Sequence, residues 1–203
     1  MFITSMGIPG CGKSSIIKSL QSIYNAQAFY EPEEDRWPDV VFQRSEYGYF
    51  SSISWFRSMR VPQLFQARKL ADKGQLVFTD SYFDKLLHNY IGKPGLDWFL
   101  PVNDRYFNLV KEMALIDYTM LPNADLVLFF LISPEIWQSF LHNRNRNMDN
   151  EEQFKNECFA LQEPMLKATE KYANDFKTSF LVIEQELSSP QNIAQKIVQR
   201  LNL

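Results

Sequence analysis

The chain has 203 residues, a formal net charge of −3, 45 % hydrophobic residues and 22 % charged residues. That length is enough for one domain with a substantial core, and the composition is ordinary for a globular protein. The slightly negative charge provides no overall basic field, so we expect no nucleic-acid partner. The longest apolar run, residues 126–132, is too short to span a bilayer, so we expect no membrane contact.

The cysteines and the N-terminus both predict a cytoplasmic protein. Cys11 and Cys158 cannot form a disulfide framework, which agrees with a reducing compartment. The chain starts with the strand-like run Met1-Phe2-Ile3 and shows no basic region or small-residue cleavage site there. Phenylalanine is unusually frequent, with 17 copies, which suits a thick core or flat ligands held between rings.

Five short apolar runs predict strands, at residues 2–6, 27–30, 75–79, 125–132 and 179–183. They are hydrophobic on both faces and are separated by segments of helical length, which indicates a parallel sheet covered on both sides. Helices are predicted over residues 13–24, 48–73, 82–90, 103–119 and 151–174, and onward from Pro134 and Pro190. A cap residue precedes each of these two prolines, as is typical of helix starts.

Residues 7–14 read Gly-Ile-Pro-Gly-Cys-Gly-Lys-Ser and match the phosphate-loop pattern G-x-x-x-x-G-K-[ST]. Glycines in such a loop let the backbone turn its N–H groups toward phosphate oxygens, and the following helix adds its positive dipole end. Lys13 is expected to reach the β- and γ-phosphates, and the Ser14 hydroxyl to ligate Mg²⁺. A glycine-rich turn could match by chance, but the flanking strand and helix favour ATP and Mg²⁺ as ligands. The expected ATP-binding residues are Gly7, Gly10, Cys11, Gly12, Lys13, Ser14 and Ser15.

Two carboxylates follow predicted strands at the edge of the sheet where ligands bind. Asp80 ends the third strand, where an acid helps to hold Mg²⁺, although an acidic helix cap would also stand there. Glu31 follows the second strand and could orient or deprotonate an attacking hydroxyl. The alternative for Glu31 is a solvated position in the acidic run of residues 31–35.

Three further segments resemble those of nucleoside and nucleotide kinases. Glu31-Pro32 with Trp37 looks like the Glu-Pro…Trp segment of deoxynucleoside kinases. Phe78-Thr79-Asp80-Ser81-Tyr82 resembles the Asp-Arg-Tyr or Glu-Arg-Ser segment of thymidylate and deoxynucleoside kinases. Phe56 and Arg60 are similar to the Phe-x-x-x-Arg of thymidylate kinases, and Arg57 takes the position of a base-reading Gln in deoxynucleoside kinases.

The resemblance implies roles for these residues. Glu31 is then the base toward a 5′-hydroxyl, Phe56 stacks on the acceptor base, and Arg57 and Arg60 bind that base. The chain departs from both families at Ser81, where they have an Arg that binds the acceptor's 5′ oxygen or monophosphate. A monophosphate acceptor needs two more negative charges neutralised, so the departure weighs against it.

A small lid is expected at about residues 142–152, where Arg144-Asn145-Arg146 closes a predicted helix. This segment resembles the arginine-bearing lid of the same kinases, which implies that Arg144 and Arg146 stabilise the transferred phosphoryl group and exclude water. The alternative is a pair of cations placed favourably at a helix C-terminus.

We therefore expect one domain over residues 1–203, with an α/β P-loop NTPase fold: a five-stranded parallel sheet, helices on both faces and a small lid. The expected activity is transfer of the ATP γ-phosphoryl group to a small-molecule acceptor, a deoxynucleoside. The alternatives are a nucleoside-monophosphate kinase, a kinase for another small hydroxyl compound, and a nucleotide-binding regulator that transfers no phosphate. The sequence leaves the oligomeric state open, a homodimer included.

Overall fold

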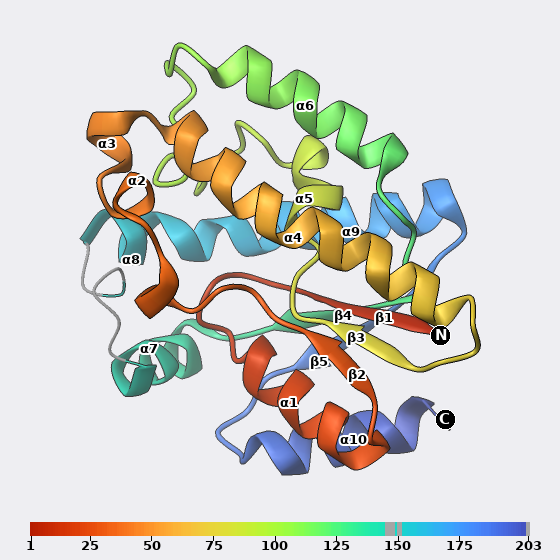
Figure 1. The fold of residues 1–203 in the computed structure, drawn as a ribbon. Coiled ribbons are helices and arrows are strands. Elements are labelled where there is room, and N and C mark those ends of the chain that lie inside the picture. Colours follow the sequence, from red (N-terminus) through yellow and green to blue (C-terminus); the bar gives the residue numbers. More distant parts are fainter. Residues whose placement is uncertain (145–148, 150–151, 202–203) are drawn as a thin grey trace.

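A computed structural model describes residues 1–144, 149 and 152–201. Its centre is one sheet of five parallel strands, which confirms the predicted fold class (Figure 1). The strands are β1 (Phe2–Met6), β2 (Gln27–Phe29), β3 (Val77–Thr79), β4 (Leu126–Leu131) and β5 (Ser179–Glu184). They lie in the order β2-β3-β1-β4-β5, and their bounds differ from the predicted ones by at most two residues at either end.

The middle of the sheet is apolar on both faces. All five residues of β1 are buried, and β1 pairs through Phe2 with Val77 of β3 and through Ile3 with Leu126 of β4. Two buried hydroxyls in this region satisfy each other, since Thr4 and Thr79 lie 2.6 Å apart between their Oγ1 atoms. Burial on both faces is what a parallel sheet covered by crossover helices requires.

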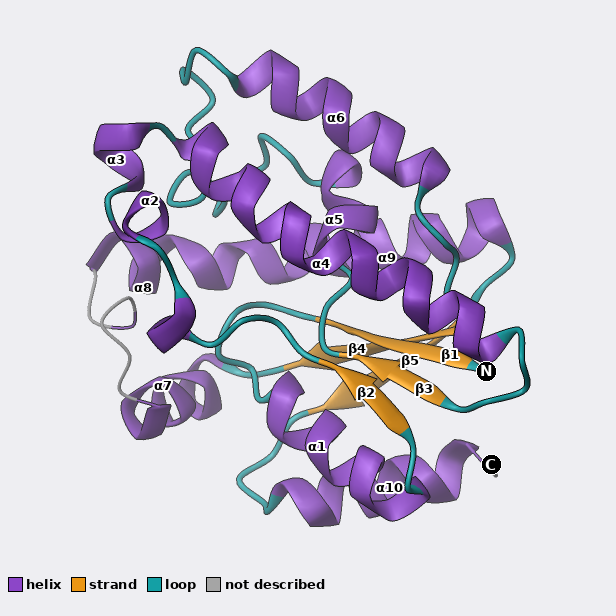
Figure 2. Cartoon of the chain, in the orientation of Figure 1, coloured by secondary structure: helices purple, strands orange, loops and turns teal. Residues whose placement is uncertain are grey.

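Helices cover both faces of the sheet (Figure 2). α1 (Lys13–Tyr24) and α10 (Pro190–Leu201) pack together on one face. The other face carries α4 (Tyr49–Ala71), α5 (Phe83–Leu86), α6 (Phe107–Met120) and α9 (Gln162–Phe176). None of the helices in the described part of the chain is long and apolar enough to cross a membrane.

Short elements gather at the carboxyl edge of the sheet, beside α7 (Pro134–Arg144) (Figure 1). They are η1 (Glu34–Arg36), α2 (Asp39–Phe42), α3 (Arg44–Tyr47) and α8 (Glu152–Cys158), while η2 (Leu87–Asn89) extends α5. The sequence did not predict the helices between residues 34 and 47, because each is too short to show a hydrophobic period. The predicted lid at 142–152 lies mostly outside the described residues.

The helix predicted over residues 151–174 is interrupted. A 3₁₀ turn, η4 (Phe159–Leu161), separates α8 from α9. The interruption lies where the backbone of Gly95 packs against the chain: a Cβ on Gly95 would stand 2.6 Å from the Glu157 carbonyl oxygen and 2.7 Å from the Leu161 nitrogen. This long-range contact leaves no periodic signal in the sequence.

Replacing Gly95 with Ala should destabilise the fold severely, because the new methyl group meets backbone atoms that cannot move aside. Gly74 provides a matched control, since its φ of +83° is close to the +89° of Gly95 but no atom lies within 4 Å of its Cβ position. Gly74→Ala should cost about 1–2 kcal/mol from the left-handed conformation alone. Thermal unfolding should show a far lower midpoint for Gly95→Ala, and equal midpoints would contradict the packing argument.

Candidate functional site

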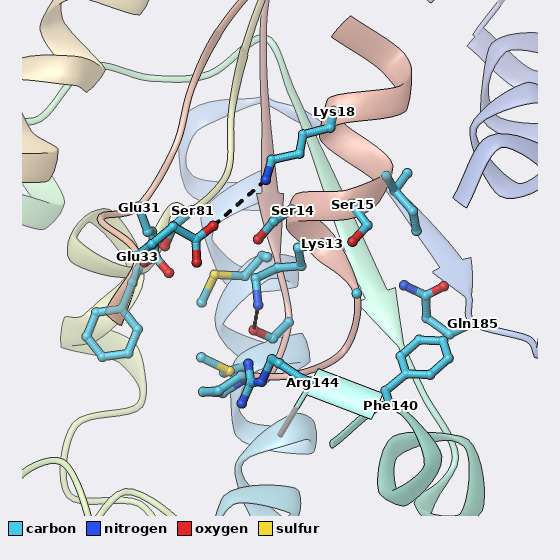
Figure 3. A pocket seen from close by; sticks show the side chains of 18 of the residues that line it. Lys13, Ser14, Ser15, Lys18, Glu31, Glu33, Ser81, Phe140, Arg144 and Gln185 are labelled. Carbon is cyan, nitrogen blue, oxygen red and sulfur yellow. Dashed lines mark hydrogen bonds and ion pairs between the residues drawn. The ribbon is translucent and has the colours of Figure 1, made fainter. Parts of the chain in front are cut away.

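A cavity of about 540 Å³ opens at the carboxyl edge of the sheet. Its floor is the phosphate loop, residues 7–14, and its walls come from α4, α7 and the segments that follow β2, β3 and β5 (Figure 3). The residues of the predicted ATP site that line it are Gly7, Gly10, Gly12, Lys13, Ser14 and Ser15. At the other end stands a group of rings that we call the aromatic chamber: Trp37, Phe56, Phe83, Trp98 and Phe99.

Side chains from three elements bind the carbonyl groups of the phosphate loop. The Lys13 ammonium group donates to the carbonyls of Gly7 and Ile8, both at 2.9 Å. The indole of Trp137 on α7 donates to the Pro9 carbonyl at 2.8 Å, and the amide of Gln185, which follows β5, donates to the Cys11 carbonyl. Because side-chain donors satisfy four of the loop carbonyls, the backbone N–H groups of the loop are left as the groups that can bind an anion.

Close packing explains two of the loop glycines. Gly10 has a φ of +80°, and a Cβ there would lie 2.6 Å from Cδ2 of Leu141 on α7. Gly7 has a φ of +142°, and its Cβ would meet the Phe130 carbonyl oxygen at 2.8 Å. A side chain at either position would move the loop away from α7 or β4. Cys11 does not line the cavity: it is buried, and burial raises the pKa of its thiol.

One face of α7 lies along the phosphate loop. Trp137, Phe140, Leu141 and Arg144 share that face, since they follow one another at helical spacing. Arg144 lines the cavity, with Nη2 3.5 Å from the Cβ position of Gly10. Its Nε donates to the buried carboxylate of Asp149 at 2.7 Å, and Nη2 donates to the same group. The guanidinium is therefore held beside the loop, whereas Arg146 lies outside the described residues.

Asp80 lies beside Ser14 at the end of β3, where its donor atoms fit Mg²⁺. Burial, and after it the nearby Glu31 charge, raise the pKa of this carboxyl to about 7, although Lys13 and the Ser14 hydroxyl oppose the shift. Its Oδ1 is buried and has no hydrogen-bond partner among the described residues. An unpartnered carboxylate oxygen next to a hydroxyl suits a hard cation that completes its coordination with phosphate oxygens and water. The described residues contain no cluster of three metal-binding side chains that could hold an ion without phosphate.

Glu31 faces the phosphate loop from the segment after β2 and is tied to α4 (Figure 3). Its Oε1 accepts a hydrogen bond from Nη1 of Arg60 at 3.1 Å. Arg60 is buried, and its other contacts go to Asp84 on α5, with Nε at 2.6 Å and Nη2 at 3.0 Å from the two carboxylate oxygens. The pKa of Arg60 is raised: burial opposes its charge, but Asp84 and Glu31 more than compensate.

The structure separates the two arginines predicted to bind an acceptor. Ser52, Phe56 and Arg60 line the cavity from one face of α4, at intervals of four residues. Arg57 lies about 100° around the helix from Phe56, the middle residue of that face, and does not line the cavity. Its guanidinium donates twice to the buried carboxylate of Asp117 on α6, at 2.7 Å each. Arg57, which the sequence assigned to an acceptor base, is therefore paired with Asp117 between two helices and does not line the cavity, which disagrees with the predicted role.

Sequence reasoning missed four residues that shape this site. Trp137 and Gln185 hold the loop carbonyls, Phe140 lines the cavity over Gly12, and Asp84 holds Arg60. The helical spacing of Trp137, Phe140 and Arg144 on one face was a usable signal. For Asp84 and Gln185 no local pattern exists, because each meets its partner across the fold.

Replacing Lys13 with Ala should weaken ATP-Mg²⁺ binding by a few kcal/mol, the order of a buried charged contact. Lys18→Ala is the matched control, because Lys18 also lines the cavity one turn along α1 but faces Glu33 at 3.8 Å. Calorimetric titration should show a loss for Lys13→Ala and near-parental affinity for Lys18→Ala. Parental affinity in Lys13→Ala would show that the loop is not a phosphate site.

Comparisons with known proteins agree on the fold. Neither a protein-family model nor a curated protein matches the sequence. The solved structure of deoxyadenosine kinase from M. mycoides with the products dCMP and a flexible dCDP bound has a TM-score of 0.69 at 17 % identity, over 100 % of this chain and 99 % of that one. The structures of that kinase with dATP and with dCTP have TM-scores of 0.68 and 0.67 at 21 % and 18 % identity, over 100 % of this chain and 100 % and 99 % of theirs. Over its whole length, the chain has the same fold as that deoxyadenosine kinase.

Proposed function

We propose that this protein is an ATP-dependent kinase that transfers the γ-phosphoryl group of ATP to the 5′-hydroxyl of a deoxynucleoside. The observation that carries the proposal is the position of Glu31, which lines the same cavity as Lys13 and Ser14 and is joined through Arg60 to the rings of the aromatic chamber. A carboxylate between a phosphate cradle and a ring-lined chamber is what transfer to a nucleoside hydroxyl needs.

The phosphate loop holds the donor in this proposal. Its N–H groups and Lys13 bind the β- and γ-phosphates, and Ser14 and Asp80 hold the Mg²⁺ that neutralises part of their charge. Arg144 lies beside Gly10, where it can stabilise charge on the transferring group, and Arg146 is assigned the same role from the sequence alone. Phe140 and Gln185 border the far end of the loop at Gly12, away from Glu31.

The aromatic chamber holds the acceptor base. The Arg60 guanidinium lies over the rings of Phe56 and Phe83, with 5.4 Å and 5.3 Å from its Cζ to the ring centroids, and Phe83 and Phe99 pack edge to face at 4.9 Å. Flat apolar surfaces of this kind bind a nucleobase through stacking. Two cations border the chamber: Arg60, which lies over Phe56 and Phe83, and Arg44, whose Nε donates to the Trp98 carbonyl at 3.4 Å. We assign the acceptor-side role to Arg60, since Arg57 does not line the cavity.

Electrostatics favours a nucleoside over a nucleoside monophosphate. Ser81 lines the cavity without a charge, Arg60 is already shared by two carboxylates, and Lys18 faces Glu33. Arg44 also lines the cavity, and its Nε donates to the Trp98 carbonyl at 3.4 Å. A monophosphate would bring two more negative charges to this end, next to Glu31. The similarity in fold to a kinase whose solved structures hold deoxynucleotides supports the same substrate class.

An acceptor panel tests the proposal. ADP release should rise above a no-acceptor control with at least one of the four common deoxynucleosides and stay at the control level with their 5′-monophosphates. Stimulation by monophosphates alone would replace the proposal with a nucleotide kinase. ATP binding without stimulation by any deoxynucleoside or monophosphate would leave either a different hydroxyl acceptor or a nucleotide-binding regulator.

Glu31→Gln should lose about 10² to 10⁴ in kcat while ATP affinity stays near the parental value, because the variant keeps the shape of the side chain and removes the base. Glu33→Gln and Glu34→Gln are controls from the same acidic run and should keep most of the turnover. Steady-state kinetics with the acceptor found in the panel makes the comparison. If all three variants keep the parental turnover, the base lies elsewhere.

A further inference from the structure

Asp84 is a buried carboxylate that does not line the cavity, yet a single residue, Arg60, connects it to Glu31. It lies in α5, and only 5 % of the residue is exposed. Both of its oxygens accept from Arg60, at 2.6 Å from Nε and 3.0 Å from Nη2. Arg60 in turn donates through Nη1 to Glu31. The three side chains form a line from α5 through α4 to the segment after β2.

Arg60 therefore makes unequal contacts with its two carboxylates. The forked, two-bond contact that a guanidinium prefers goes to Asp84, and Glu31 receives one bond at 3.1 Å on Oε1. The Arg60 guanidinium also makes cation–π contacts with the rings of Phe56 and Phe83, which help to hold it in place. Glu31 is the more exposed partner, with 38 % of its side chain accessible against 6 % for Asp84.

Without the charge of Asp84, Arg60 would have one carboxylate left to bind. A buried guanidinium that loses its partner seeks another, and the nearest one is Glu31. A forked contact would then engage one lone pair on each Glu31 oxygen, hold the carboxylate in the plane of the guanidinium and lower its basicity, which makes it a poorer base for an acceptor hydroxyl.

We propose that Asp84 is a positioning residue for the phosphoryl transfer: by binding the fork of Arg60, it limits Arg60 to one bond with Glu31 and keeps the second Glu31 oxygen available to the acceptor. This inference rests on the proposed role of Glu31 as the base. It assigns Asp84 no contact with either substrate.

A double-mutant cycle separates this role from a purely structural one. Asp84→Asn should lower kcat about 10- to 100-fold, the scale of a misplaced catalytic group, with the KM for ATP nearly unchanged. In the Glu31→Gln background the same substitution should change kcat less than about threefold, because its effect passes through Glu31. A full loss in both backgrounds would overturn the proposal, and so would parental kcat in Asp84→Asn.

Asp117→Asn is the matched control, since it breaks the bidentate pair that Arg57 makes on another face of α4. It should lower thermal stability without a coupling to Glu31 in kcat, and a coupling as large as that of Asp84→Asn would overturn the proposal. If Asp84→Asn does not fold, Arg60→Lys replaces it, because lysine keeps the charge but cannot make the fork. Coupling of Arg60→Lys to Glu31→Gln then supports the proposal, and additivity refutes it.

Failure of the Asp84 proposal can be told apart from failure of the proposed kinase function. If the parental protein shows no acceptor-dependent ADP release, or if Glu31→Gln keeps parental turnover, the kinase proposal or its base is wrong. If the parent is active and Glu31→Gln is impaired, the cycle tests Asp84 alone. Coupled losses are the expected result, and independent losses would leave Asp84 as a structural residue.

Discussion

The orientation of the phosphate-loop carbonyls is the constraint on which the rest of the site depends. A loop that binds phosphate must turn its N–H groups outward, so its carbonyls need donors inside the protein. Lys13, Trp137 and Gln185 supply those donors from α1, α7 and the segment after β5. The hydrogen bonds of Trp137 and Gln185 attach α7 and the segment after β5 to the loop. They therefore position these two walls of the cavity relative to the loop that forms its floor.

Two ion pairs on α4 have opposite consequences for function. Arg57 donates two hydrogen bonds to Asp117, and that ion pair joins α4 to α6 away from the cavity. Arg60 is buried between Asp84 and Glu31, and this pair stands at the cavity. Arg60 and Asp84 are buried, and burying such charges costs solvation energy that their mutual attraction only partly repays, so this pair beside a cavity invites a functional explanation. Control of the Glu31 geometry is such an explanation.

The abundant phenylalanines divide between two tasks. Phe2, Phe78, Phe129 and Phe130 are fully buried in and around the sheet, whereas Phe56, Phe83, Phe99 and Phe140 line the cavity. The sequence suggested a thick core or rings that hold flat ligands; the structure shows the core and also places rings at the cavity, where holding a flat ligand stays a prediction. No sequence pattern separates the two groups, because a ring that packs on a core and a ring that stacks on a ligand need the same side chain.

The sequence by itself determined the sheet, the phosphate loop and the places of Glu31 and Asp80, because each depends on contacts between near neighbours along the chain or on a strand end. Hydrophobic runs define buried strands, and a glycine pattern between a strand and a helix defines the loop. Only the tertiary structure decided that Arg60 faces the cavity while Arg57 does not, that Gly95 interrupts a helix, and that Asp84 and Gln185 belong to the site. Those outcomes depend on partners from 24 to 174 residues away in sequence, Asp84 for Arg60 and Cys11 for Gln185 among them. A local pattern holds no information about such partners, since the fold brings them together only after every element has packed.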